Sequence, residues 1–252
     1  MDRIAPLVGR RFERFELDVD GVRLAGVDLA QLHYVRELRE QRRERTFVRL
    51  LREAVPPGGT VLEGGAHLGF VTVHAARAAG PGGRVVVFEP NPAVHGVLRE
   101  NLAANGVSDR VEVIAKALGE ASGTARFFVR ADESSLYEPS GEAETTEVDV
   151  VRADELLDGP VDVVKLDVEG AEVAALRGME RLLTSTGRPR ALFLECNPGL
   201  LERSGSSAAE LLAWVGARGY EIEWIDEPHG CTAPLSEPWT GDYVNLRCVR
   251  RP

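Results

Sequence analysis

The feature that most constrains the fold is a regular alternation of apolar strands and helical segments between residues 60 and 225. Runs such as VLEG and VDVVKLD are short, rich in valine and bounded by glycine or proline, which is typical of buried strands. Parallel strands need a helical crossover, so the alternation predicts an α/β domain whose parallel sheet has helices on both faces. The expected strands are 61–64, 85–90, 111–115, 161–167 and 191–195, and the expected helices are 70–79, 92–104, 171–184 and 207–218.

The last two expected strands, 220–225 and 243–249, have no helix between them. They therefore predict a C-terminal antiparallel hairpin, joined by a long loop that contains His229. Another pair of strands, at 125–129 and 146–151, is expected as an insertion or an edge pair. Together the pattern predicts a Rossmann-like fold with a mostly parallel, seven-stranded sheet.

Residues 1–55 differ from the rest and are expected to form an N-terminal cap on a Rossmann-like domain at 56–252. FELDVDGVRLAG, at 15–26, has an Asp-Gly turn between alternating segments, which predicts a hairpin. Residues 31–54 have the periodicity of one charged amphipathic helix, which the following PPGG ends. Its basic residues are interleaved with glutamates at helical pairing distances, so we expect a solvated helix face.

Charge and cysteine content exclude several classes of protein. A formal net charge of −10 over 252 residues disfavours nucleic acid as a partner. The three cysteines form no CxxC pair, so neither a zinc site nor a disulfide framework is expected. The segment MDRIAPLVGR lacks the apolar core of a signal peptide, and no apolar run approaches the roughly 18 residues that span a bilayer. These features predict a cytoplasmic protein without a membrane partner.

The first glycine-rich turn, in VLEGGAHLGF, predicts a ligand site. An apolar strand runs into Glu63, and Gly65 and Gly69 precede the next helix. Glycines let a ligand approach the backbone, and a helix N-terminus offers unpaired N–H groups. The spacing ExGxxxG differs from the dinucleotide fingerprint GxGxxG, and an acid at Glu63 suits a sulfonium or amino group better than a pyrophosphate. A tight turn without a ligand is the alternative interpretation.

A second acid, Glu89, ends the next strand in VVVFEPNP. A carboxylate at this place can accept hydrogen bonds from both ribose hydroxyls of a nucleoside cofactor. Because NAD enzymes also use an acid here, Glu89 predicts a nucleoside ligand without identifying the group that it transfers. The alternative is an acid that is merely exposed at a strand end.

Charged residues lie at the ends of two later expected strands, 161–167 and 191–195. Lys165 and Asp167 are two residues apart, so they share one face of their strand. Charges in a buried strand are costly unless they are paired or functional. Glu169 and Glu172 follow at the helix start, where they could also be no more than favourable N-terminal charges. Glu195 ends the neighbouring strand.

Several segments together resemble the FkbM family of S-adenosylmethionine-dependent O-methyltransferases. They are VLEGGAHLGF, VFEPNP, ENLAANG, ALGE, SSL at 134–136 and KLDVEGAEVAALRG. The KxDVEGxE segment is the most specific of them. The resemblance implies a class I methyltransferase fold, S-adenosylmethionine as cofactor and S-adenosylhomocysteine as product. It also implies natural product biosynthesis, with methylation of a hydroxyl on a sugar, polyketide or other secondary metabolite.

The resemblance implies that four strand ends bind the cofactor. The residues concerned are Glu63, Gly64, Gly65, His67, Gly69, Glu89, Pro90, Asn91, Lys116, Ala117 and Asp167. Lys116 and Ala117 are expected near the adenine. His67 stands where such sequences usually carry asparagine, and Glu63 where they usually carry aspartate, so both positions stay polar.

Methyl transfer to an alcohol needs a base that removes the hydroxyl proton. The candidates are Asp167, His229, Glu169 and Glu195, with Asp167 preferred and His229 second. Clustered carboxylates could instead hold Mg²⁺, which is possible but not predicted.

Two other functions stay open at this point. One is a nicotinamide-dependent oxidoreductase, which the spacing of the first turn disfavours. The other is a cofactor-binding module without catalysis. The expected partner is a small-molecule acceptor, and a homo-oligomer formed through residues 31–54 is possible.

Overall fold

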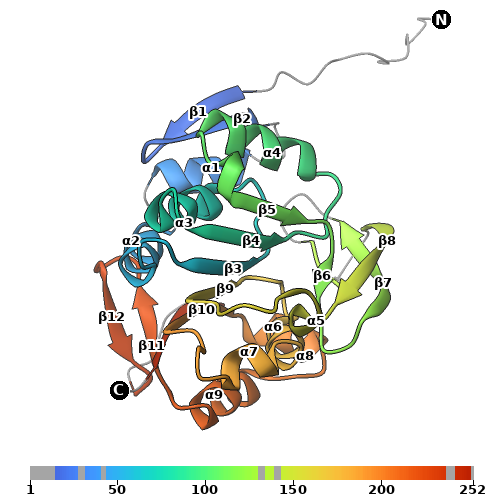
Figure 1. Ribbon diagram of the computed structural model, residues 1–252. Helices are drawn as coiled ribbons and strands as arrows, with labels where there is room; N and C mark the ends of the chain where they lie inside the picture. Colours follow the sequence, from blue (N-terminus) through green and yellow to red (C-terminus); the bar gives the residue numbers. More distant parts are fainter. Residues whose placement is uncertain are drawn as a thin grey trace, which may run out of the picture.

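A computed structural model describes residues 15–27, 32–40, 44–129, 134–138, 143–236 and 242–250 (Figure 1). Its central sheet consists of β3 (Thr60–Gly64), β4 (Arg84–Phe88), β5 (Val111–Ile114), β9 (Val163–Leu166), β10 (Ala191–Cys196), β11 (Tyr220–Asp226), β12 (Cys231–Pro234) and β13 (Val244–Arg250). The spatial order is β12-β11-β13-β10-β9-β3-β4-β5. Strands β10, β9, β3, β4 and β5 are parallel neighbours, and β13 is antiparallel to both β10 and β11.

The predicted Rossmann-like α/β fold is therefore confirmed, but the described sheet has eight strands and not seven. The additional strand, β12, lies in the segment expected to be a loop and pairs antiparallel with β11. The sequence of β12, CTAP, has only short side chains and ends in proline, which does not indicate a strand, so this edge strand depends on its pairing with β11.

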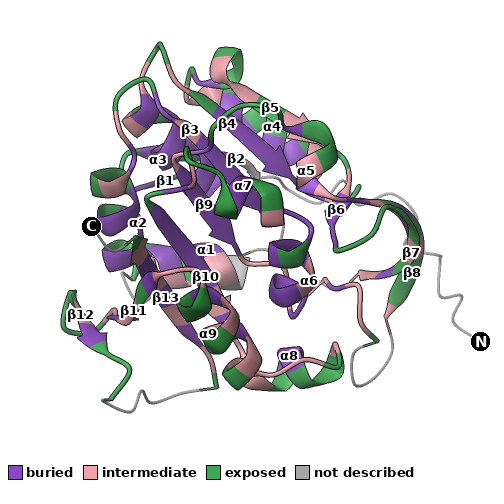
Figure 2. Cartoon of the chain, turned by 60° about the horizontal axis from the view of Figure 1, so that its bottom comes forward, coloured by how far each residue is buried: buried purple, intermediate pink, exposed green. Residues whose placement is uncertain are grey.

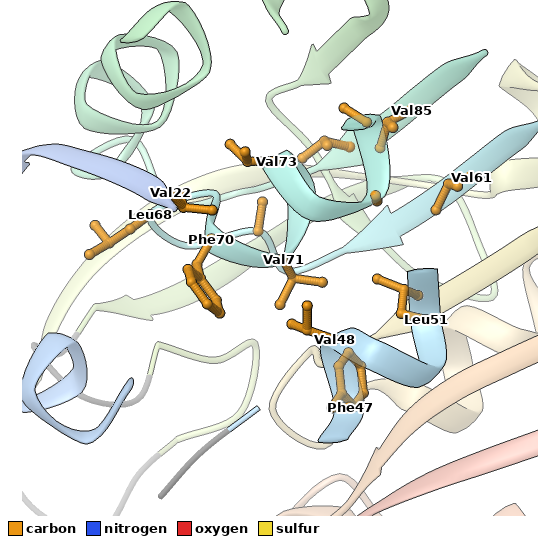
Figure 3. Packing of buried hydrophobic residues seen from close by; sticks show 14 of the residues in the cluster. Val22, Phe47, Val48, Leu51, Val61, Leu68, Phe70, Val71, Val73 and Val85 are labelled. Atoms are coloured by element: carbon orange, nitrogen blue, oxygen red, sulfur yellow. The ribbon is translucent and has the colours of Figure 1, made fainter. Parts of the chain in front are cut away.

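Helices cover both faces of the sheet because alternate residues of each strand point to opposite sides. The helices are α1 (Leu32–Arg39), α2 (Arg45–Ala54), α3 (Phe70–Ala79), α4 (His95–Ala104), α5 (Ala153–Leu156), α6 (Glu172–Arg177), α7 (Glu180–Thr184), α8 (Pro198–Arg203) and α9 (Ala208–Ala217). On one face α2, α3 and α4 pack against strand residues such as Val61 and Val85 (Figure 3). On the other face α5 to α9 cover residues such as Leu62 and Leu194. The central strands are buried on both sides (Figure 2), so they form a rigid base for the loops at the sheet edge.

The N-terminal part begins with the expected hairpin of β1 (Phe15–Val19) and β2 (Val22–Val27). Its turn residues, Asp20 and Gly21, both have positive φ, as a two-residue hairpin turn requires. The hairpin packs on α4, and its buried side chains belong to the same hydrophobic cluster as α3 and α4. The division of the chain at residue 55 stays a prediction.

The prediction of a single helix at 31–54 was wrong, because this segment contains two helices, α1 and α2. No apolar residue lies between Leu38 and Phe47, so a continuous helix would have no apolar face to bury there. Helix α2 begins after Glu44, whose φ is 64°. The carboxylate of Glu227 accepts N–H groups of its first turn at 2.8 and 2.9 Å, which ties α2 to the end of β11.

The strand pair expected as an insertion belongs to a separate three-stranded sheet, ordered β6-β8-β7. Its strands are β6 (Ala117–Leu118), β7 (Gly123–Val129) and β8 (Glu144–Val151). The helix expected at 171–184 is interrupted between α6 and α7, where the backbone of Gly178 packs so closely that a Cβ would lie 1.9 Å from the Gly119 oxygen. None of the described helices is long and apolar enough to cross a membrane.

Candidate active site

The carboxyl ends of β3, β4, β9 and β10 meet at one edge of the sheet, where ligands bind in open α/β folds. The register of β3 with β9 places Glu63 beside Lys165. The register of β9 with β10 brings Asp167 next to Glu195, on strands about 4.8 Å apart. Four charged side chains are thus concentrated within three neighbouring strands.

The turn after β3 requires its glycines. Gly65 has φ of 76°, and a Cβ there would lie 1.8 Å from the backbone oxygen of Asp167. Gly69, with φ of 84°, immediately precedes α3. His67 also has positive φ, at 50°, which is unusual for a residue with a side chain and typical of functional sites. The ring of Tyr34, from α1, contacts the His67 ring edge-on with centroids 4.9 Å apart.

Glu89 connects this turn to the end of β4. Its buried carboxylate accepts the N–H groups of Ala66 at 3.0 Å, His67 at 2.9 Å and Asn91 at 2.9 Å. The side-chain oxygen of Asn91 in turn accepts the backbone N–H of Ala93 at 3.0 Å. Pro90 lies between Glu89 and Asn91 in the sequence. A carboxylate has about four acceptor positions, so three backbone donors leave Glu89 with limited remaining capacity.

A buried ion pair lies beside the turn. Glu63 is 1% exposed, and its two carboxylate oxygens have no hydrogen-bond partner among the described residues. Burial raises the pKa of Glu63, while Lys165 and the nearby Thr72 hydroxyl, which does not donate a hydrogen bond to it, lower it. The Lys165 ammonium, 4% exposed, lies 3.7 Å from Glu63 and 3.7 Å from Asp167, and it donates a hydrogen bond to the Gly65 oxygen. The site therefore contains a buried cation between two carboxylates.

Two further acids are buried close by. Burial raises the pKa of Glu172 to about 7, although its carboxylate accepts N–H groups of the loop after β9 at 3.0 and 3.4 Å. Burial also raises the pKa of Glu195 well above its usual value, and Asp167, Glu169 and Glu172 raise it further. The predicted acids are thus brought together. Within the described ranges, no group of three or more His, Cys, Asp or Glu side chains is arranged to hold a metal ion.

The SSL segment connects two of the loops at this edge. The buried Ser135 donates from Oγ to the backbone oxygen of Glu169 at 3.0 Å. Ser134 Oγ accepts a hydrogen bond from the Asn91 amide at 3.4 Å. Glu169 has φ of 54°, a second strained residue at the site, and Ser135 holds it in place.

Lys116 and Ala117 follow β5 at the same sheet edge, but their side chains point to other partners. The Lys116 ammonium lies 3.2 Å from the Asp149 carboxylate of β8. Ala117 is buried in the small cluster of the three-stranded sheet. A cofactor contact at Ala117 would therefore use its backbone.

His229 is not brought to the other candidate bases. Its side chain is 77% exposed, and its Nδ1 lies 2.8 Å from Asp226. Strands β13 and β10 lie between β11 and β9. Three strand spacings, roughly 14 Å, therefore separate the end of β11 from Asp167.

Several side chains at the site were not among the predicted site residues, including Lys165, Glu172, Ser134, Ser135 and Tyr34. The charges of the KxDVEGxE segment were a signal for Lys165 and Glu172, and SSL in the family resemblance was a signal for the two serines. The contact of Tyr34 joins segments far apart in the chain, and no local pattern indicates it.

Comparison with known proteins identifies the family. The model of the methyltransferase FkbM domain matches residues 63–222, well over half of the chain, and every predicted site residue except His229 lies in this range. A solved structure of a proposed rRNA-methylase from Clostridium thermocellum has the same fold, with a TM-score of 0.53 at 14% identity over 81% of this chain and 92% of that one.

Two curated relatives are similar over shorter segments. A catechol O-methyltransferase from Mycobacterium tuberculosis is 43% identical over 91 residues, which are 36% of this chain and 40% of that protein. An arginine N(omega)-methyltransferase from Streptomyces achromogenes subsp. streptozoticus is 32% identical over 105 residues, 41% of this chain and 28% of that protein. The chain thus spans less than half the length of either. None of these matches supports the nicotinamide-dependent alternative. The chain belongs to the FkbM methyltransferase family and carries an S-adenosylmethionine-dependent methyltransferase domain.

Proposed function

We propose that the protein methylates a hydroxyl of a small-molecule acceptor, such as a sugar, a polyketide or another secondary metabolite. One observation carries this proposal: the backbone of Gly65, in the cofactor turn, lies directly against the backbone of Asp167 at the end of β9. A cofactor held by the turn would therefore lie beside the carboxylate that we propose as the base.

The residues at the edge fit the cofactor. The buried Glu63 carboxylate, without a hydrogen-bond partner in the described part of the chain, suits the ammonium or sulfonium of S-adenosylmethionine. Glu89 would accept hydrogen bonds from the ribose hydroxyls. Its two oxygens would then be shared between these hydroxyls and the three backbone N–H groups, or one of the N–H groups would lose its hydrogen bond. The proposed cofactor-binding residues are Glu63, Gly64, Gly65, His67, Gly69, Glu89, Pro90, Asn91, Lys116, Ala117 and Asp167.

When bound, S-adenosylmethionine supplies the methyl group, and Asp167 would accept the proton of the acceptor hydroxyl. The side chain of Asp167 is 39% exposed, so an acceptor can reach it from solvent. Glu195 is the less accessible candidate, because it is more buried than Asp167, and burial and neighbouring carboxylates raise its pKa well above its usual value. Glu169 is a further candidate, and His229 would act only if its loop approached β9.

A second acceptor class, an amine or guanidine, is favoured by the concentration of carboxylates. Asp167 and Glu169 would attract a cationic acceptor, and one relative is named as an arginine N(omega)-methyltransferase. The relative named as a catechol O-methyltransferase supports oxygen as the acceptor atom. The net charge of −10 disfavours nucleic acid in either case.

Isothermal titration with S-adenosylhomocysteine, NAD⁺ and NADH tests the proposal. We expect micromolar binding of S-adenosylhomocysteine alone. Mass spectrometry would then follow methylation of catechols, sugars and guanidines in parallel. Binding of a nicotinamide alone would overturn the proposal, and binding of S-adenosylhomocysteine without any methylated product would favour a non-catalytic module.

A further inference from the structure

Lys165 is a buried cation that contacts two parts of the site. Its ammonium donates to the backbone oxygen of Gly65 in the turn after β3, and it lies 3.7 Å from both Glu63 and Asp167. The ammonium thus makes one hydrogen bond, to the turn after β3, and two ion pairs, one with β3 and one with the end of β9.

The surroundings of Lys165 keep it charged. Burial lowers its pKa, but the carboxylates of Asp167 and Glu63, with Glu44 and Glu89 beyond them, raise the pKa above its ordinary value. A buried ammonium is costly unless it is paired. The cation is therefore a fixed part of the site.

We infer that Lys165 is a positioning residue that holds the cofactor turn in its binding conformation. Its hydrogen bond fixes the Gly65 peptide, and the next two N–H groups of the turn, from Ala66 and His67, are held by Glu89. Lys165 thus binds a carbonyl oxygen of the turn, and Glu89 binds two of its N–H groups. This inference rests on the proposed function, because the turn is the proposed cofactor site.

A purely structural role makes a different prediction. If Lys165 only compensates the buried charge of Glu63, removing both charges together would restore the site, because the other partner of Lys165, Asp167, is 39% exposed and can be solvated. If Lys165 positions the turn, removing both would relieve the buried charge but leave the Gly65 oxygen without its donor. The variant Glu63→Gln, with and without Lys165→Met, separates the two roles.

The experiment measures S-adenosylhomocysteine affinity by calorimetry and unfolding by denaturant in four full-length variants. They are Lys165→Met, Glu63→Gln, the double variant, and the control Arg84→Met, which removes an exposed ion pair at the opposite end of β4. We expect the double variant to unfold near the midpoint of Glu63→Gln and to bind about tenfold more weakly than it, which is the effect of one lost hydrogen bond to a charged donor. The control should match the wild type in affinity.

Equal affinity of the double variant and Glu63→Gln would overturn the positioning role, even if Lys165→Met alone failed to fold. Absence of S-adenosylhomocysteine binding in the wild-type protein would instead contradict the proposed function. The two failures are therefore distinguishable.

Discussion

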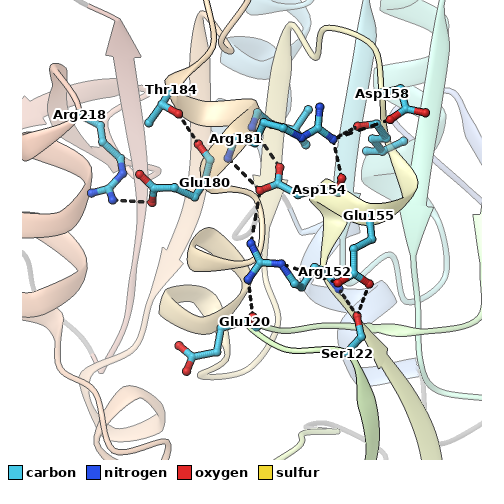
Figure 4. A network of polar contacts seen from close by, with 12 residues as sticks. Glu120, Ser122, Arg152, Asp154, Glu155, Asp158, Glu180, Arg181, Thr184 and Arg218 are labelled. Carbon is cyan, nitrogen blue, oxygen red and sulfur yellow. Dashed lines mark hydrogen bonds and ion pairs between the residues drawn. The ribbon is translucent and has the colours of Figure 1, made fainter.

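Two clusters of charged residues in this protein, one around α5 and one at the carboxyl edge of the central sheet, differ in how their hydrogen-bond acceptors are used. Around α5, Asp154 accepts the first N–H groups of α7 at 2.8 and 3.1 Å and lies 3.6 Å from Arg152 (Figure 4). At the candidate active site, both carboxylate oxygens of Glu63 and one of Glu195 have no hydrogen-bond partner in the parts of the chain that the structure describes. Asp154 thus uses both of its carboxylate oxygens within the protein, whereas Glu63 and Glu195 have buried oxygens that accept no hydrogen bond from a described residue.

This difference distinguishes a cluster that stabilises the fold from a cluster that can bind a ligand. Buried polar groups are normally hydrogen-bonded, so unused acceptors at a sheet edge indicate a ligand that would use them. The strain at His67 and Glu169 lies at the same edge, and such strain persists where the surrounding structure enforces it. Both oxygens of Asp154, by contrast, already accept N–H groups of α7, so they are not available to a ligand. Variants in the two clusters should therefore affect different measurements.

The largest effect is expected for Asp167→Asn. Loss of a general base typically lowers turnover about 10²- to 10⁴-fold. The affinity for S-adenosylhomocysteine should change by less than about threefold, because the amide keeps the shape of the side chain and leaves the turn intact. Steady-state kinetics with the identified acceptor and calorimetry give the two values. Unchanged turnover would remove Asp167 as the base.

A pH effect is expected from Glu172. Its pKa is about 7 in the folded protein against 4.5 in the unfolded chain, so the folded state binds the proton more tightly. The wild type should lose about 3 kcal/mol of stability as pH rises from 4.5 to 7, with no further loss from this group above 7. Glu172→Gln lacks this loss, so its stability relative to wild type should rise over that window. Urea unfolding measures this difference in stability between Glu172→Gln and the wild type. A difference that does not change with pH would contradict the raised pKa of Glu172.

A smaller effect is expected for Glu89→Ala. This change removes the proposed ribose acceptor and the partner of three backbone donors. The affinity for S-adenosylhomocysteine should fall about 10- to 100-fold, as for the loss of charged hydrogen bonds. The exposed Glu112, which pairs with Arg84, provides the control Glu112→Ala. Calorimetry that gives both variants the wild-type affinity would exclude Glu89 from the site.

The smallest effect is expected in the other cluster. Asp154→Ala removes the acceptor for the first turn of α7 and should lower the free energy of unfolding by about 1–2 kcal/mol. Cofactor affinity should stay unchanged at a temperature where the variant is folded. A loss of affinity there would mean that the two clusters are coupled.

Much of the fold could be predicted because its signals are local. Valine-rich strands, the glycines at 65 and 69, and the crossover helices fix the parallel core, and strand ends share one edge in such a sheet. The observed order β9-β3-β4 brings the ends of these strands, and with them Asp167, Glu63 and Glu89, to one edge, where the family resemblance implies a cofactor site. The break between α1 and α2 was missed, because charge pairing along a helix resembles helical periodicity even where nothing is buried.

Other features depend on contacts between distant segments. The insertion of β13 between β10 and β11 separates His229 from Asp167, and spacing along the chain does not show this order. Likewise, Tyr34 reaches His67 only through the packing of α1. The roles of the predicted site residues stay predictions until a ligand is observed.

The most direct test of the central claim is a crystal structure of the protein with S-adenosylhomocysteine. We expect the ribose hydroxyls within hydrogen-bond distance of Glu89 and the sulfur between the Gly65 turn and Asp167. A ligand bound elsewhere, or a ribose held by another acid, would contradict the account.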